Sequence, residues 1–182
     1  GQLLNISSLA NDAGVSANTA KAWISVLEAS FVIYLLRPHH VNVNKRLIKM
    51  PKLYFYDTGL VCSLLDVSSA EQLNTHYLLG ALFETFVLSE LLKARFNKGL
   101  RSNLYFWRDH KGKEIDCLAD HGQNFTAIEI KAGRTYTESY FDNLRFWNKL
   151  SGNTGESSFV IYGGEKSFNT KFIEILKLKD CY

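Results

Sequence analysis

The sequence predicts a mixed α/β (α+β) chain of two domains, and three observations support this prediction. Apolar residues recur at helical spacing in residues 5–30, and two β-rich runs separated by a polar loop follow them. From residue 78 onward, a long helical pattern precedes several alternating strands. With 182 residues, 46% of them hydrophobic, the chain has enough apolar material for one ordinary core or two small cores with an interface. We place the domains at residues 1–75 and 76–182.

Residues 5–30 have the pattern of a helix-turn-helix. Gly14 suits the tight turn, and Ser16 is expected to cap the second helix. The apolar stripe of the two helices comprises Ala10, Val15, Ala20, Trp23 and Leu27. The β-rich runs 31–36 and 52–56 then supply a wing. The first domain is therefore predicted to be a winged helix-turn-helix.

The loop between the two β-rich runs is basic. From Arg37 to Lys52, where the second run begins, there are five basic residues, Arg37, Lys45, Arg46, Lys49 and Lys52, and no acid follows until Asp57. Such a wing suits contacts to the phosphates of DNA, for which we select Lys45, Arg46 and Lys49. The alternative is a solvated hairpin with a structural or protein-contact role, because Lys21 is the only base in the second helix.

The second domain begins with a predicted helix and continues as three strands, a helix and a strand. The expected ranges are a helix at 78–96, strands at 103–108, 113–119 and 125–131, a helix at 137–150 and a strand at 158–163, with a final β-rich run at 171–178. Because a helix connects the strands that end at Lys131 and begin at Ser158, these two strands are expected to be parallel. The domain is thus a three-stranded meander extended by a βαβ unit.

The second and third strands form a hairpin that places acidic residues on one face. If the loop is His121 to Asn124, counting from the turn places Asp116 opposite Glu129 and Glu114 opposite Lys131. The apolar residues expected on the other face are Ile115, Cys117, Ile128 and Ile130. Glu114 and Lys131 would form an ion pair, whereas two opposed acids should destabilise the hairpin by up to ~1 kcal/mol.

A third acid, Glu84, lies in the first helix of this domain. At about 100° per residue, the polar side of the helix contains Thr85, Ser89 and Lys93, and Glu84 falls on the apolar side. A buried acid needs a charged partner, a hydrogen-bond donor or a metal ion. One divalent cation such as magnesium would satisfy Glu84, Asp116 and Glu129 together.

These residues resemble the motif of the PD-(D/E)XK nuclease superfamily, whose core has the order αβββαβ. The resemblance covers Glu84 on the leading helix, Asp116 on the second strand and the triplet Glu129, Ile130 and Lys131 on the third. It implies that Asp116, Glu129 and the backbone carbonyl of Ile130 bind Mg²⁺ or Mn²⁺, with Glu84 as a direct or water-mediated ligand. It also implies that Lys131 orients the attacking water or stabilises the pentacovalent phosphate. Glu114 competes for Lys131 in this arrangement.

The whole chain also resembles the uncharacterised region that follows the AAA-type ATPase module in many prokaryotic ATPases. The stretches that carry this resemblance are "YFYDTGL" at residues 54–60 and "GALFETFVLSELL" at residues 80–92. The chain begins at Gly1, and we expect an upstream ATPase module that would hold any ATP site. The implied activity is magnesium-dependent hydrolysis of DNA phosphodiesters. The alternative is an inactive nuclease scaffold that binds DNA or protein and regulates the ATPase.

The remaining signals are weaker. Arg108 and Lys111 near the first strand turn, with Arg134 after the triplet, are predicted phosphate contacts, and an exposed hairpin tip is the alternative. A net charge of +3 does not identify a nucleic-acid binder. The three cysteines have no zinc or disulfide spacing, which favours a reducing cytoplasm, and no apolar run is long enough for a membrane span. The sequence leaves open whether the chain forms a homo-oligomer.

Overall fold

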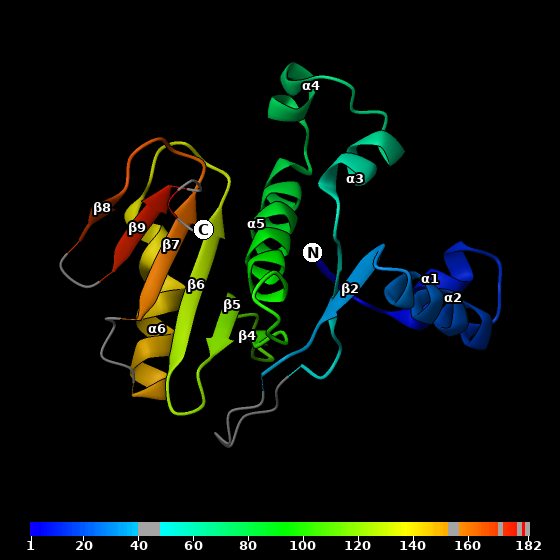
Figure 1. The fold of residues 1–182 in the computed structure, drawn as a ribbon, viewed down its shortest axis with the longest axis horizontal. Helices are drawn as coiled ribbons and strands as arrows, with labels where there is room; N and C mark the ends of the chain where they lie inside the picture. The colour runs from blue at the N-terminus through cyan, green and yellow to red at the C-terminus, as the bar shows by residue number, and fades with distance from the viewer. Residues whose placement is uncertain (40–47, 153–156, 171–172, 178–179, 181–182) are drawn as a thin grey trace.

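The computed structural model describes the chain except for residues 40–47, 153–156, 171–172, 178–179 and 181–182. The described residues form an α+β structure with two β-sheets (Figure 1). One sheet has the strand order β1-β3-β2, and the other has the order β4-β5-β6-β7-β9-β8. Among the described residues, no helix combines the length and apolar character that a bilayer span requires.

Two helices and a small antiparallel sheet form the N-terminal part. The elements are β1 (Gln2–Leu3), α1 (Ile6–Asp12), α2 (Ala17–Ala29), β2 (Ile33–Leu36) and β3 (Lys52–Phe55). The turn between the helices contains Gly14 at φ +67°, a left-handed conformation that glycine adopts without strain. The Ser16 side chain accepts the Thr19 N–H at 3.1 Å and caps α2. The glycine turn and the Ser16 cap, both predicted from the sequence, are confirmed.

Two short helices that the sequence analysis did not predict follow β3. They are α3 (Thr58–Leu64) and α4 (Ala70–Thr75), which lie at the top of Figure 1. Each begins at a side-chain cap. Asp57 accepts the N–H groups of Gly59 and Leu60, and Ser69 accepts the N–H of Gln72. Neither helix contains a buried residue, so hydrophobic periodicity gave no signal for them.

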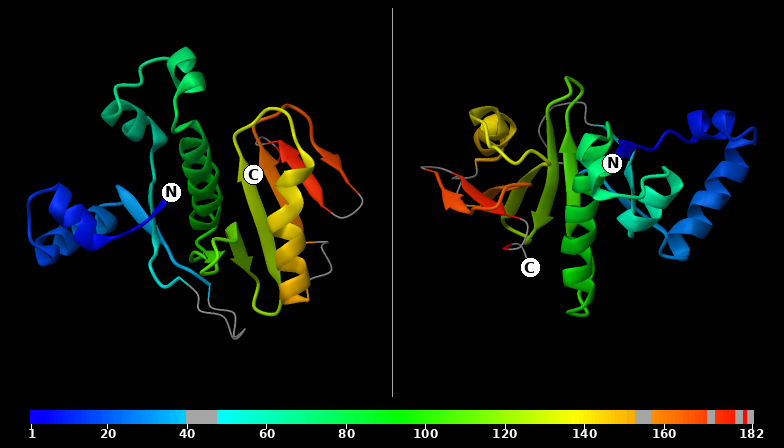
Figure 2. Two further views of the ribbon diagram at one scale, coloured as in Figure 1. Left: turned by 180° about the vertical axis from the view of Figure 1, so that it is seen from behind. Right: turned by 90° about the horizontal axis from the view of Figure 1, so that it is seen from above.

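The C-terminal part follows the predicted order of elements. Its elements are α5 (Leu79–Phe96), β4 (Leu104–Arg108), β5 (Glu114–Asp120), β6 (Phe125–Lys131), the 3₁₀ turn η1 (Glu138–Phe141), α6 (Asp142–Ser151), β7 (Ser158–Tyr162), β8 (Phe168–Asn169) and β9 (Glu174–Lys177). Strands β6 and β7 are parallel neighbours, as expected, and β9 runs parallel to β7. Helix α5 covers one face of the sheet and α6 covers the other (Figure 2).

The core on the α5 side joins the two parts of the chain. Its buried residues from the N-terminal sheet are Tyr34, Leu36 and Tyr54, and those from the larger part include Val87, Leu88, Leu92, Phe106, Cys117, Ile128 and Ile130. On the α6 side, a second cluster includes Trp107 and Trp147, whose ring centroids lie 5.4 Å apart. The two predicted domains therefore share one apolar layer. Trp23 on α2 lies outside this layer and is about half exposed.

Two residues that were predicted on the polar side of α5 are buried in the structure. Lys93 is exposed, but Thr85 and Ser89 are buried, so the sequence prediction was wrong for both. Their hydroxyl groups donate to the carbonyl oxygens of Ala81 and Phe86 within the same helix. Because these bonds satisfy the hydroxyls, both side chains tolerate an apolar environment.

Strand β5 contains an irregularity that the sequence analysis missed. The predicted hairpin register is confirmed from Asp120–Phe125 to Cys117–Ile128. Against β4, however, Tyr105 pairs with Leu118 and Trp107 with Ile115, so β5 holds one extra residue there. This bulge turns Ile115 toward the α6 side while Cys117 faces α5. The prediction that these two residues share a face was therefore wrong.

Candidate functional site

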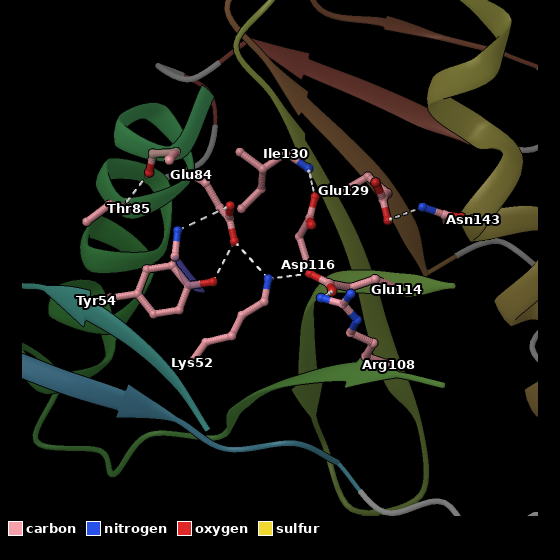
Figure 3. A network of polar contacts seen from close by, with 12 residues as sticks. Lys52, Tyr54, Glu84, Thr85, Arg108, Glu114, Asp116, Glu129, Ile130 and Asn143 are labelled. Atoms are coloured by element: carbon pink, nitrogen blue, oxygen red, sulfur yellow. Dashed lines mark hydrogen bonds and ion pairs between the residues drawn. The ribbon is translucent and has the colours of Figure 1, made fainter. Parts of the chain in front are cut away.

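The bulge in β5 places the Asp116 carboxylate against β6. One of its oxygens, Oδ2, accepts the backbone N–H of Ile130 at 2.9 Å (Figure 3). From the turn, the described backbone pairing of β5 with β6 extends only to Cys117 and Ile128, one residue short of Asp116 and two residues short of Ile130. Because a buried N–H requires an acceptor, the aspartate side chain takes the place of a strand partner for Ile130. Asp116 is thus fixed on the triplet that the sequence motif identified.

Lys131 connects the two acids of the hairpin. Its Nζ lies 2.5 Å from Glu129 Oε2 and 3.5 Å from Asp116 Oδ2. Asn143 of α6 contacts the other oxygen of Glu129 at 3.5 Å. The predicted ion pair between Glu114 and Lys131 is not formed, because Lys131 binds these acids instead. The sequence correctly predicted that Asp116 and Glu129 lie near one ammonium group.

The environment shifts the proton affinity of all three groups. Burial and then the charge of Asp116 raise the pKa of Glu129 to about 8, although Lys131 opposes this effect. Burial likewise raises the pKa of Asp116 above its ordinary range, again against Lys131. Burial lowers the pKa of Lys131, but the two acids raise it by more, so the ammonium stays charged. Two acids with one shared cation form a site that favours additional positive charge.

Glu84 lies in a separate set of contacts on the α5 side. Its Oε1 accepts hydrogen bonds from Lys52 Nζ at 3.1 Å and from the Tyr54 hydroxyl at 2.5 Å (Figure 3). Burial raises the pKa of Glu84, but these partners lower it by more, with Lys52 the strongest among them. Glu84 is therefore ionised and paired with Lys52.

Lys52 is the functional candidate that sequence reasoning misplaced. We counted it among the basic residues of a wing that could contact phosphates, whereas its side chain is 4% exposed and contacts both Glu84 and Glu114. Arg108 completes the set with a 3.1 Å contact to Glu114. A signal for this burial exists in the alternation of β3, because Lys52 lies two residues before the buried Tyr54 and so shares its face.

This geometry corrects the expectation that Glu84, Asp116 and Glu129 lie around one cation. Within the part of the chain that the structure describes, no three His, Cys, Asp or Glu residues lie close enough to hold a metal ion. Asp116 and Glu129 share Lys131, while Glu84 is held by Lys52. As a donor set, Asp116 and Glu129 fit a hard divalent cation, since both are carboxylates that lack a full complement of positive charge. Glu84 does not fit in this arrangement.

The predicted nucleic-acid contacts fall into three groups. Lys49, Lys111 and Arg134 are exposed, whereas Arg108 is partly covered and bound to Glu114. Lys45 and Arg46 lie outside the described residues. Asp109 accepts the N–H groups of Lys111 and Lys113 at 2.9 Å each, which fixes the turn between β4 and β5. Lys111 is therefore presented from an ordered turn.

Comparisons with known proteins give the following matches. Residues 79–181 match the sequence model of a domain of unknown function, DUF4143, and residues 1–71 match that of another domain of unknown function, DUF8612. Uncharacterised proteins of Mycobacterium bovis and Mycobacterium tuberculosis are each 34% identical over 169 residues. The matched region covers 92% of this chain but only 36% of each relative, so the chain spans about a third of their length. No solved structure matches significantly.

Proposed function

The chain belongs to the DUF4143 family, and from the cluster around Asp116 we propose that it is a metal-dependent phosphodiesterase of the PD-(D/E)XK nuclease type acting on DNA. The observation that carries this proposal is the pair of acids, Asp116 and Glu129, held on adjacent strands by the single ammonium of Lys131. The order α5-β4-β5-β6-α6-β7 supports it, because it is the αβββαβ order of that superfamily.

The two acids would hold Mg²⁺ or Mn²⁺ beside Lys131. When bound, such a cation makes hydroxide available near neutral pH and shields the charge of the phosphodiester. Asp116 is oriented by the Ile130 N–H, and Asn143 restrains Glu129. Lys131 keeps its proton, so its role is to orient water or to offset charge on the phosphate, and it does not act as a base.

DNA would reach this cluster through the exposed basic residues. Lys49, Lys111 and Arg134 are available for phosphate contacts, and Lys45 and Arg46 extend the set in the sequence. We assign a winged helix-turn-helix role in substrate placement to α1, α2 and the strands after them. The longer relatives leave room for further modules, among which we propose an AAA-type ATPase.

Calorimetric titration with Mn²⁺ and a DNA cleavage assay test the proposal. Asp116→Asn and Glu129→Gln should each weaken Mn²⁺ binding by roughly tenfold or more, because each removes a charged ligand. Lys131→Ala should slow cleavage by about 100-fold, since it removes charge stabilisation from the transition state. Glu90→Gln is the matched control, because Glu90 also lies on α5 and pairs with Lys93 of the same helix. Equal cleavage by wild type and Lys131→Ala would contradict the mechanism.

A second candidate function is a non-catalytic scaffold that binds DNA or protein and regulates an ATPase. The observation in its favour is that Glu84, Glu114, Asp116 and Glu129 each contact a basic side chain of the chain itself. This candidate predicts that Mn²⁺ binding does not depend on the carboxylates. It also predicts that Asp116→Asn binds DNA as wild type does, while charge removal at Lys111 and Arg134 weakens binding in a salt-dependent manner.

A further inference from the structure

Lys52 comes from a part of the chain distant from the acids that it binds. It lies on β3, the central strand of the N-terminal sheet, between β1 and β2. Its ammonium contacts Glu84 of α5 and Glu114 of β5, and Tyr54 of the same strand also binds Glu84. One strand of the N-terminal sheet thus supplies two of the side chains that hold Glu84 (Figure 3).

The charge on Lys52 is retained in spite of its burial. Burial lowers the pKa of Lys52, but the charges of Glu84, Glu114 and Asp116 raise it by more, and the net pKa lies above the ordinary value. The charge of Lys52 also lowers the pKa of Asp116, although burial raises it by more. Lys52 therefore acts electrostatically on both sets of acids.

The cluster has fewer basic side chains than acidic ones. Its acids are Glu84, Glu114, Asp116 and Glu129, and its basic side chains are Lys52, Arg108 and Lys131. Loss of Lys52 would leave Glu84 ionised without a basic side chain, while Glu114 would keep Arg108 as its partner. Buried acids in that state require a replacement cation or must take up protons.

We infer that Lys52 is a built-in counter-ion that competes with a divalent cation for Glu84, so that the N-terminal sheet determines whether Glu84 joins the metal site. This inference rests on the proposed function. With Lys52 in contact, Asp116 and Glu129 are the metal-binding acids and Glu84 is excluded. With Lys52 withdrawn, the Tyr54 hydrogen bond still orients Glu84, and the carboxylate becomes a third ligand. Lys52 is thus a positioning residue for the metal site.

A double-mutant cycle of Mn²⁺ affinity tests this competition. Calorimetry compares wild type, Glu84→Gln, Lys52→Met and the double variant. In wild type, Glu84→Gln should change the Mn²⁺ affinity by less than about twofold, because Lys52 already holds Glu84 away from the cation. Lys52→Met should bind Mn²⁺ roughly tenfold more tightly, and in that background Glu84→Gln should abolish the gain. A purely structural role for Lys52 would not produce this dependence on Glu84.

Thermal unfolding with and without Mn²⁺ keeps the test decisive if Lys52→Met is unstable. Removing one partner of a buried ion pair leaves an uncompensated charge and is strongly destabilising, so Lys52→Met should melt well below wild type in chelator. Mn²⁺ should then raise its melting temperature by more than it raises that of wild type, because the cation replaces the lost ammonium. Lys93→Met, an exposed lysine on α5, is the control and should match wild type in both measurements.

The outcomes separate this inference from the proposed function. If Asp116→Asn does not weaken Mn²⁺ binding by wild type, the proposed function fails and the inference fails with it. If that dependence holds but Glu84→Gln has the same effect in both backgrounds, only the inference is overturned. A Lys52→Met protein that stays unfolded in saturating Mn²⁺ also overturns it, since the cation then does not replace Lys52.

Discussion

At the level of single residues, Asp116 has a structural and a chemical role at once. Its carboxylate satisfies the Ile130 N–H where strand pairing ends, and it also contacts the Lys131 ammonium. Counting from the turn brought Asp116 near Glu129, because the hairpin register is local, but it paired Lys131 with Glu114, whereas Lys131 binds Asp116 and Glu129. The partners of Glu114 and Glu84 were not predictable in this way. They depend on a bulge in β5 and on Lys52, which is distant in sequence.

The raised pKa of Glu129 predicts that the free energy of unfolding falls as pH rises. In the folded chain this group titrates near pH 8, whereas its ordinary pKa is 4.5. Between these values the folded state binds more protons than the unfolded state, so stability decreases with increasing pH in that window. Glutamine does not titrate, so Glu129→Gln removes this loss of stability at high pH. In chelator, its melting temperature should exceed that of wild type most at pH 8, and the difference should shrink toward pH 5.

Thermal melts of both proteins between pH 4.5 and pH 8.5 check this expectation. The control is Glu138→Gln, because Glu138 is an exposed acid paired with Arg145 on the surface. Parallel melting curves for wild type and Glu129→Gln across the range would show that Glu129 is ionised throughout.

At the level of elements, local signals predicted most helices and strands. The cap at Ser16, the glycine turn before it and the alternation in β5 and β6 each depend on neighbouring residues, which the sequence displays directly. Helices α3 and α4 were missed because they bury no side chain and so lack an apolar stripe. Strand β8 has only two residues, too few to show an alternation.

Ser16 should stabilise α2 through its cap. Ser16→Ala leaves the Thr19 N–H without its side-chain acceptor and should lower the free energy of unfolding by about 1 kcal/mol. Ser16→Asp retains an acceptor at the same position and should cost less than the alanine variant. Urea unfolding followed by circular dichroism measures both. A larger loss for Ser16→Asp than for Ser16→Ala would contradict the assigned cap.

At the level of the whole molecule, the sequence pattern changes near residue 75, while the structure shows one apolar layer that includes both parts. Tyr34, Leu36 and Tyr54 of the N-terminal sheet belong to the same buried cluster as Leu88 of α5. Contacts of this kind between distant segments have no local signature. The change of pattern therefore left open whether the chain has one core or two small cores with an interface.

The shared core predicts that both parts unfold together. Leu88 is fully buried, so Leu88→Ala should lower the free energy of unfolding by roughly 2–5 kcal/mol and move a single calorimetric transition to lower temperature. Leu64→Ala on α3 is the control, since Leu64 is 67% exposed and should have little effect. Two separate transitions, of which Leu88→Ala shifts only one, would show that the parts are independent.

The distribution of the three tryptophans gives the protein two optical reporters without any label. Trp107 and Trp147 are buried in the cluster between α6 and the larger sheet. Their fluorescence emission should therefore be blue-shifted and protected from quenching by iodide. Trp23 on α2 is 52% exposed, so it should emit at longer wavelength and be quenched first. A molecule that docks on α2 would therefore change the red component of the emission while the blue component stays constant.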